Sequence, residues 1–223
     1  GWFTAGTVAS TSIALWTGSE WRPTDPPPQA SGITALAVWN GQLVVGTSWG
    51  WVGAYDGTTW QELGEFYDGS SAPGEIRALV SYNGALVACG EFDSVDWAGG
   101  GANVGTVASW NGSGWAMLGT GPGPGAPRCA AVFQGSLFVG GYFDPTASWP
   151  APPETQNLRV WNGTAWSSVG LWNGPIDRLA ARIGTALTNS FLYAGGSFTT
   201  VNTTIAAPRV ARFSPSTNSW AGI

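Results

Sequence analysis

The chain has 223 residues and a net charge of −5, and its eight basic residues are all arginine because lysine and histidine are absent. This length is enough for one domain with its own hydrophobic core. So few cations, set against thirteen acidic residues, exclude the basic surface that a nucleic-acid-binding protein needs. The lack of histidine and lysine excludes Ser-His-Asp and Cys-His nucleophiles, histidine-ligated metal centres and Schiff-base chemistry. No apolar run reaches the length of a membrane-spanning helix.

An aromatic residue, a glycine-containing turn and a tryptophan recur along the chain. Four clear copies and a looser fifth copy occupy these segments: Trp16–Trp21, Tyr55–Trp60, Trp110–Trp115, Trp161–Trp166 and Phe213–Trp220. In the clear copies the two aromatic residues flank a four-residue turn, so we expect their rings to face each other across a hairpin. Repetition at this spacing indicates stacked copies of one supersecondary unit.

A pair of short apolar runs precedes the aromatic motif in each full copy. The runs flank turn glycines that are 43, 51 and 49 residues apart, namely Gly41, Gly84, Gly135 and Gly184. Glycine accepts the positive φ of a tight hairpin turn, so each pair of runs predicts an inner β-hairpin. With the two strands of the aromatic motif, each repeat has four short antiparallel strands, which is typical of a propeller blade. No segment has the period and caps of an α-helix.

We therefore expect an all-β propeller of about five blades in a single domain, residues 1–223. A partial blade covers 1–32, and full repeats cover 33–75, 76–126, 127–175 and 176–223. Gly1–Phe3 aligns with the Gly-x-Phe that ends the inner hairpin in other copies, so the partial blade lacks that hairpin. Two alternatives remain open. Either the chain is a processed or truncated part of a longer protein, or another segment or subunit supplies the hairpin and covers the open sheet edges.

Two segments carry a resemblance to a known family of repeats. Leu137–Phe143 follows the pattern Leu-x-Val-Gly-Gly-x-Phe, and Val107–Gly119 follows Val-Ala-x-Trp-Asn-Gly-x-x-Trp-x-x-Leu-Gly. These patterns resemble the Kelch-like β-propeller repeats of secreted and cell-surface proteins, and the chain is similar in size to five-bladed propeller lectins. The resemblance implies a fold and no particular activity, because propellers have unrelated functions. The copper site of the Kelch-like oxidase needs histidine, so we expect neither a metal nor a cofactor here.

Cys89 occupies a position where other repeats have glycine, and Cys129 lies on the innermost strand of the next repeat. If the two blades are neighbours, a disulfide would close a 40-residue loop and stabilise the fold by about 3–4 kcal/mol. Two buried free thiols are the alternative, because cysteine also packs as a small hydrophobic residue. The secreted character of the chain favours the disulfide.

Three N-glycosylation sequons begin at Asn111, Asn162 and Asn202. The first two are also Asn-Gly pairs of predicted hairpin turns, so a structural role explains them as well. A solvent-facing turn is nevertheless a place where a glycan can be attached. We therefore expect a secreted, extracellular glycoprotein.

The variable loop after each inner hairpin contains the candidate ligand-binding residues, which are Trp49, Trp97, Trp149, Asp93 and Asp144. Flat aromatic rings suit the apolar faces of sugars, and nearby carboxylates accept hydrogen bonds from hydroxyl groups. The alternative is that these loops pack over their own blades.

These features give three expectations for function. The first is a non-catalytic propeller that binds glycans or a cell-surface ligand through the aromatic loops. The second is a structural subunit of an extracellular filament or coat, which self-associates by completing the open blade. The third and most remote is a glycosidase, which needs two carboxylates about 5–10 Å apart. The candidate carboxylates are Glu91, Asp93, Asp96 and Asp144. The alternative is that they are solvated loop residues. Asp93 and Asp96 could help to hold a calcium ion, but two carboxylates without the rest of a loop motif are weak evidence for such a site.

Overall fold

Hairpin turns determine where the strands begin and end. The computed structural model describes residues 2–5, 8–24, 26–29, 32–143 and 156–223. In three inner hairpins both turn residues have positive φ, as a type I′ turn requires; these pairs are Asn40 and Gly41, Asn83 and Gly84, and Gln134 and Gly135. The fourth inner hairpin has a longer loop that contains the 3-10 turn η1 (Leu187–Asn189).

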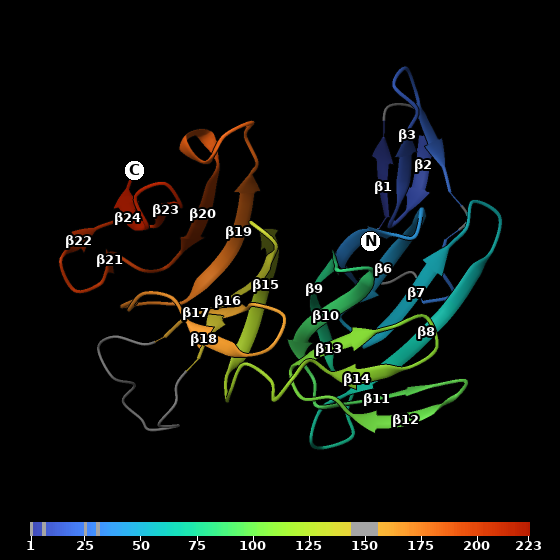
Figure 1. Ribbon diagram of the computed structural model, residues 1–223. Coiled ribbons are helices and arrows are strands. Elements are labelled where there is room, and N and C mark those ends of the chain that lie inside the picture. Colours follow the sequence, from blue (N-terminus) through green and yellow to red (C-terminus); the bar gives the residue numbers. More distant parts are fainter. Residues whose placement is uncertain (1, 6–7, 25, 30–31, 144–155) are drawn as a thin grey trace.

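Four antiparallel sheets form the blades, each running in chain order from its inner to its outer strand (Figure 1). The first blade has β5 (Ile33–Trp39), β6 (Gln42–Thr47), β7 (Trp51–Tyr55) and β8 (Trp60–Tyr67). The second has β9 (Glu75–Tyr82), β10 (Ala85–Glu91), β13 (Val107–Trp110) and β14 (Trp115–Met117). The third has β15 (Ala126–Phe133), β16 (Ser136–Tyr142), β17 (Leu158–Trp161) and β18 (Trp166–Ser168). The fourth has β19 (Ile176–Arg182), β20 (Phe191–Gly196), β23 (Val210–Ser214) and β24 (Ser219–Gly222).

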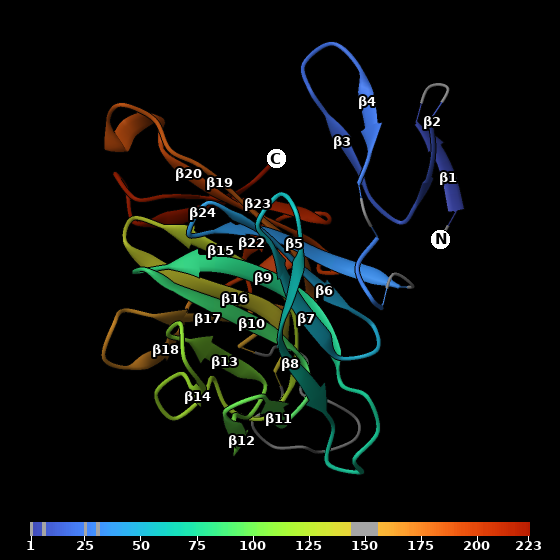
Figure 2. The same cartoon turned by 90° about the vertical axis from the view of Figure 1, so that its right-hand side faces the viewer.

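Three further hairpins complete the described strands. The segment between β10 and β13 forms β11 (Ser94–Trp97) and β12 (Gly100–Asn103), and β11 pairs with β8, so it widens the first blade to six strands. In the fourth blade the equivalent segment forms β21 (Thr200–Val201) and β22 (Ile205–Ala206). At the N-terminus, β1 (Trp2–Ala5) pairs with β2 (Val8–Thr11), and β3 (Ala14–Trp16) pairs with β4 (Trp21–Pro23). These N-terminal hairpins stand apart from the four blades (Figure 2).

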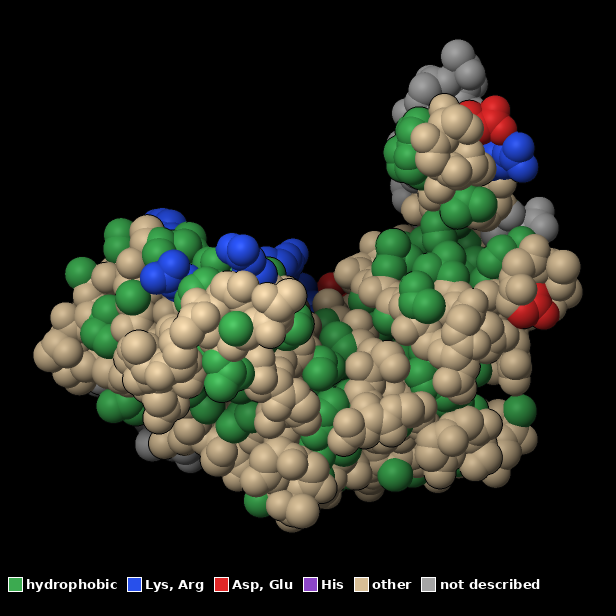
Figure 3. All heavy atoms as spheres, turned by 45° about the horizontal axis from the view of Figure 1, so that its top comes forward, with side chains coloured by type: hydrophobic (Ala, Val, Ile, Leu, Met, Phe, Trp, Pro, Cys, Tyr) green, Lys and Arg blue, Asp and Glu red, His purple; other side chains and the backbone are tan. Residues whose placement is uncertain are grey.

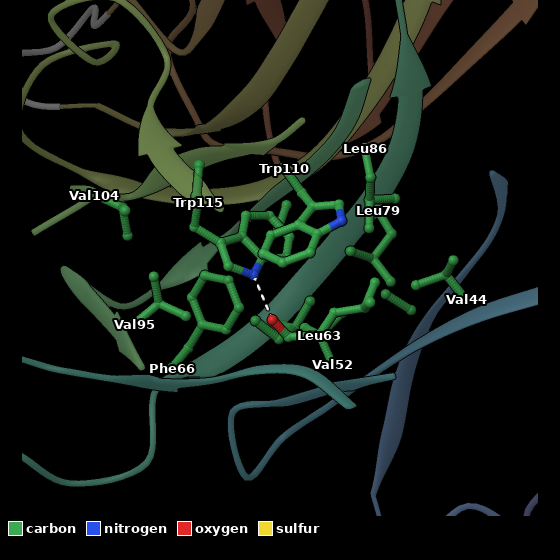
Figure 4. Packing of buried hydrophobic residues seen from close by; sticks show 14 of the residues in the cluster. Val44, Val52, Leu63, Phe66, Leu79, Leu86, Val95, Val104, Trp110 and Trp115 are labelled. Atoms are coloured by element: carbon green, nitrogen blue, oxygen red, sulfur yellow. Dashed lines mark hydrogen bonds between the residues drawn. The ribbon is translucent and has the colours of Figure 1, made fainter. Parts of the chain in front are cut away.

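The first strands of the blades line the centre of the molecule. Strand β9 packs between β5 and β15, and β15 packs between β9 and β19. Three hydrophobic clusters fill the spaces between successive blades, one cluster for each pair of neighbours. In the cluster between the first and second blades, Trp115 and Phe66 pack edge to face with ring centroids 4.9 Å apart (Figure 4). The core therefore lies between sheets, as it must when each sheet alone can bury neither face.

The expected all-β propeller of four-stranded antiparallel blades, with one blade incomplete, is confirmed. The predicted pairing of aromatic residues is also found: Trp110 is opposite Trp115 and Trp161 is opposite Trp166, with ring centroids 5.5 Å apart in both pairs. The only helix among the described residues is the single 3-10 turn. No described helix is long and apolar enough to cross a bilayer.

Candidate functional site

A bulge in the first strand of every blade directs one polar residue towards the centre. The pairing register shifts between Ile33 and Ala35 in the first blade and between Ile176 and Arg178 in the fourth. The unpaired residue at each shift lines a central cavity of about 650 Å³; these four residues are Thr34, Arg77, Arg128 and Asp177. Glu75 and Arg178 line the same cavity. A bulge re-aims a side chain in this way because it inserts one unpaired residue.

Ion pairs hold most of the charged groups in the central cavity. The Arg77 guanidinium lies 2.8 Å from the Glu75 carboxylate and 3.0 Å from that of Glu91. The Arg128 guanidinium lies 2.6 Å from the Asp177 carboxylate. These pairs leave the cavity polar and nearly balanced in charge. It can accept hydrogen bonds from, or donate them to, a polar group.

The first blade presents uncovered apolar side chains on the side away from the second blade. Leu36, opposite Val45, has the same register position as Leu79, opposite Ala88. Leu79 is 5% exposed because it packs on the first blade, whereas Leu36 is 56% exposed. Val38 on the same strand is 68% exposed.

The hairpin β3–β4 also has uncovered apolar side chains. Trp16 and Trp21 form the usual cross-strand pair, with centroids 5.3 Å apart, yet they are 50% and 41% exposed. The equivalent Trp110 and Trp115 are buried between blades. We call these uncovered residues of the hairpin and the first blade the N-terminal end: Leu15, Trp16, Trp21, Leu36 and Val38.

The fourth blade has a different character on its corresponding free side. Side chains alternate along its strands, so that one face of the sheet packs on the third blade. We call the opposite face the fourth-blade face, and it carries Arg178, Arg182, Phe191, Tyr193 and Arg212. In Figure 3 arginine side chains gather over this end of the molecule, and hydrophobic side chains lie below the N-terminal hairpins at the other end.

The structure places the candidate ligand-binding residues in different surroundings. Trp49 lies in the loop between β6 and β7 and is exposed. Trp97 is half-buried and packs edge to face on Trp110, with centroids 6.3 Å apart. Asp93 is exposed beside Gly69. Asp144 and Trp149 lie outside the described residues. No recorded contact joins Trp49, Trp97 and Asp93 into one site.

Two of the candidate glycosidase carboxylates share a second cavity of about 590 Å³. Glu91 and Asp93 line it together with Asp68 and Glu75. Glu91 and Glu75 are paired with Arg77, and Asp68 accepts hydrogen bonds from Ser70 and the backbone of Ala72. These hydrogen bonds, first that of the Ser70 hydroxyl, hold the pKa of Asp68 below its usual range. Asp68 is thus an ionised turn residue and not a general acid, which needs a raised pKa. Among the described residues, no three His, Cys, Asp or Glu side chains are grouped as metal ligands require.

The asparagines of the three sequons are exposed. The Oδ1 atom of Asn111 accepts hydrogen bonds from the backbone of Ser113 and Gly114, and Asn162 does the same with Thr164 and Ala165. Asn202 Oδ1 accepts a hydrogen bond from the backbone of Leu171. All three side chains therefore have structural roles in addition to their sequon positions.

The expected disulfide is wrong for this structure, because Cys89 and Cys129 are buried free thiols. Cys89 packs between the second and third blades, whereas Cys129 packs between the third and fourth. The Sγ atom of Cys129 lies 3.6 Å from the carbonyl oxygen of Gly140 and 3.8 Å from that of Ile176. The two side chains belong to different hydrophobic clusters and form no disulfide. Burial raises the pKa of both thiols, that of Cys129 to about 12, so both are protonated.

A solved structure supports the fold. YCF48 bound to D1 peptide matches 92% of this chain and 57% of its own, with 14% identity and a TM-score of 0.50. This chain shares the β-propeller fold. The computationally designed proteins Ika4 and Ika8 are each 19% identical, with TM-scores of 0.48 and 0.49. The match to Ika4 covers 77% of this chain and 89% of Ika4. The match to Ika8 covers 85% of this chain and 48% of Ika8. No protein-family model and no curated protein matches the sequence.

Sequence reasoning missed both the central cavity and the fourth-blade face. A signal for the second was present, because residues 171–223 contain four of the eight arginines and one of the thirteen acidic residues. No comparable signal marks the bulges.

Proposed function

We propose that this chain is a non-catalytic, extracellular β-propeller that works as a structural subunit and joins to further copies through its incomplete blade. The N-terminal end supports this proposal, since its residues have the sequence pattern of a blade interface but no blade covers them. Uncovered sheet faces and edges of this kind are normally paired or covered. The strongest support is a difference in exposure: the Leu36 side chain is 56% exposed, whereas Leu79 at the same register position of the second blade is 5% exposed.

Burial of the N-terminal end would provide a substantial driving force. Covering a leucine or valine side chain fully is worth roughly 1.5–3 kcal/mol. Part of this gain is offset by the loss of translational and rotational freedom on association. With Leu36 and Val38 uncovered on β5, and Trp16 and Trp21 uncovered on the hairpin β3–β4, we expect a weak to moderate association.

Sedimentation velocity of two matched variants tests the proposal. Trp21→Asp with Val38→Asp, called the N-end variant, places carboxylates on the N-terminal end and should reduce self-association at least tenfold. The control, Met117→Asp with Leu171→Asp, changes two hydrophobic residues that are 39% and 40% exposed elsewhere on the surface. It should associate as the unmodified chain does. Equal association of the unmodified chain and both variants would contradict the proposal.

Glycan binding is the second candidate function, and Trp49 is the observation that favours it. Its side chain is 60% exposed, in a loop that follows an inner hairpin, and an exposed indole can stack on a sugar ring. We expect Trp49→Ala to abolish binding on a glycan array, while Trp97→Ala, whose ring packs on Trp110, leaves binding within about twofold. An unmodified chain that binds no glycan would remove this candidate.

Glycosylation and secretion form part of the same proposal. The exposure of Asn111, Asn162 and Asn202 supports it, because an acceptor asparagine must be accessible. When the chain is expressed through a eukaryotic secretory pathway, we expect its mass to fall after enzymatic removal of N-glycans. No change in mass would contradict glycosylation without affecting the structural role.

A further inference from the structure

We infer that copies of this chain join head to tail, with the N-terminal end of one copy docked on the fourth-blade face of a second copy. This inference rests on the proposed function, because it names the partner surface for the same incomplete blade. It is carried by a set of arginines that form no ion pair with described residues, by a hydrogen bond that occurs at two of the junctions between blades and by the distribution of charge along the chain.

The fourth-blade face has arginine where the other blades have residues that pack on the next blade. Arg178, opposite Gly195, has the register position of Ala35, Ala78 and Cys129. Arg182 has the register position of three buried aromatic residues, Trp39, Tyr82 and Phe133. A contact made of aliphatic side chains alone would leave these guanidinium groups buried and unpaired, which is costly. The face therefore selects a partner that can interact with cations.

The arginines of this face have bonding capacity to spare. None of the ion pairs between described residues involves Arg178, Arg182 or Arg212. The Nε atom of Arg212 is buried without a hydrogen-bond partner among the described residues, and its guanidinium lies 4.6 Å from the Phe191 ring centroid. The nearby Asp177 carboxylate is already paired with Arg128.

The N-terminal end has the chemistry that such a face would bind. It presents the rings of Trp16 and Trp21, and arginine side chains stack favourably on tryptophan. The charges are also complementary, because residues 1–75, which contain the N-terminal hairpins and the first blade, carry a net charge of −6 and residues 171–223 carry +3. Opposite net charges at the two ends steer copies into a head-to-tail encounter and disfavour contacts between like ends.

A hydrogen bond found at two of the three junctions between blades indicates how the two ends meet. Trp115 Nε1 donates to the carbonyl of Leu63 in the preceding blade, and Trp166 Nε1 donates to that of Leu118, both at 2.8 Å. In each case the acceptor lies three residues after the second tryptophan of its own blade. At the third junction the equivalent Trp220 Nε1 has no partner among the described residues, and the Val169 carbonyl accepts from Trp172 instead. In the N-terminal hairpin β3–β4 the residue equivalent to the donor is Trp21, which is 41% exposed. In the fourth blade the residue equivalent to the acceptor is Ile223, three residues after Trp220, and it is 61% exposed. Docking would repeat the hydrogen bond between Trp21 of one copy and Ile223 of the next.

A mixing experiment with two variants tests the inference. The N-end variant, Trp21→Asp with Val38→Asp, keeps an intact fourth-blade face. The face variant, Arg178→Glu with Arg182→Glu, keeps an intact N-terminal end. Head-to-tail joining needs one of each surface, so each variant alone should sediment as a 23.1 kDa monomer. Their equimolar mixture should form a heterodimer of about twice that mass, because a heterologous contact needs only one intact copy of each surface.

The results of this experiment distinguish head-to-tail joining from self-association of any other kind. If the face variant alone still associates while the N-end variant does not, the N-terminal ends join to each other and the head-to-tail inference is wrong. If the unmodified chain does not associate at all, the proposed function fails. Arg209→Glu is the charge control, since it reverses an exposed arginine of the same blade outside the face, and it should associate like the unmodified chain. Circular dichroism and thermal unfolding establish that each variant is folded.

Discussion

The indole Nε1 of Trp115, in β14 of the second blade, donates a hydrogen bond of 2.8 Å to the main-chain carbonyl oxygen of Leu63 in β8 of the first blade (Figure 4). Both groups are buried, and the ring of Phe66 packs against the same indole. Trp166 and Leu118 repeat the hydrogen bond between the third and second blades. At these two junctions the recurring tryptophan therefore joins neighbouring sheets in addition to pairing within its own hairpin.

Trp115→Phe should destabilise the fold by about 1–3 kcal/mol, because the carbonyl of Leu63 would remain buried without its donor. Urea denaturation measures this as a lower midpoint with an unchanged slope. Trp16→Phe, at an exposed position in the N-terminal hairpin, is the control and should change stability by less than about 0.5 kcal/mol. Equal effects of the two substitutions would show that the hydrogen bond between blades contributes nothing.

Gly46→Ala should destabilise the fold by about 1–3 kcal/mol through overpacking. A Cβ atom at Gly46 would lie 2.5 Å from Cγ2 and 2.9 Å from Cβ of Ile76 in the next blade. The equivalent Gly195 in the fourth blade has only the Arg209 carbonyl oxygen within 4 Å, at 3.8 Å. Gly195→Ala should therefore be tolerated in the monomer, and thermal unfolding of both variants measures the difference. Comparable losses at the two positions would mean that something covers the fourth-blade face in the free chain.

The two buried thiols should be unreactive in the folded chain. We expect slow reaction with a thiol reagent under native conditions and rapid reaction of two thiols after unfolding without reductant, because thiolate is the reactive species. Zero reactive thiols in the unfolded chain would show that a disulfide forms after all.

The same thiols give a pH dependence with a defined sign. Free thiols ionise near pH 8.5 in the unfolded chain, whereas burial raises the pKa of Cys129 to about 12. Between these values the unfolded state binds fewer protons, so stability falls as pH rises, by at most about 1.4 kcal/mol per pH unit for each thiol. Cys129→Ala removes one thiol and should reduce this slope in urea denaturation between about pH 9 and 11. An unchanged slope would contradict the buried position of Cys129.

The turn before β8 gives a pH dependence in acid. Hydrogen bonds from the backbone of Thr59, then from the side chain and backbone of Thr58, hold the pKa of Asp56 well below its usual range. The stabilising contribution of ionised Asp56 is therefore present above about pH 4 and is lost as pH falls further. Asp56→Asn keeps the Oδ1 acceptor, as Asn111 and Asn162 do in the equivalent turns. The variant should lose less thermal stability than the unmodified chain between pH 5 and pH 2, and an identical loss would rule out this role of Asp56.

The fold was predictable because local chemistry repeats. Asn40 and Gly41, like Asn83 and Gly84, favour type I′ turns, and the repeated four-residue turn between Trp110 and Trp115 made their cross-strand pairing predictable. The candidate site was less accessible from sequence. The bulge between Ile176 and Arg178 decides which side chains of β19 point to the free face, and no residue in the sequence marks it. Likewise, neighbouring blades do not place Cys89 and Cys129 in one cluster, because each strand has two faces.

The most direct test of the structural role is the mass of the unmodified chain in solution, measured by sedimentation velocity over a hundredfold range of concentration at low and high salt. Self-association through the incomplete blade predicts species heavier than the 23.1 kDa monomer that grow with concentration. It also predicts that they weaken when salt is raised from about 0.1 to 1 M, because the Debye length falls from about 10 to 3 Å. A single 23.1 kDa species at every concentration and salt level would contradict it.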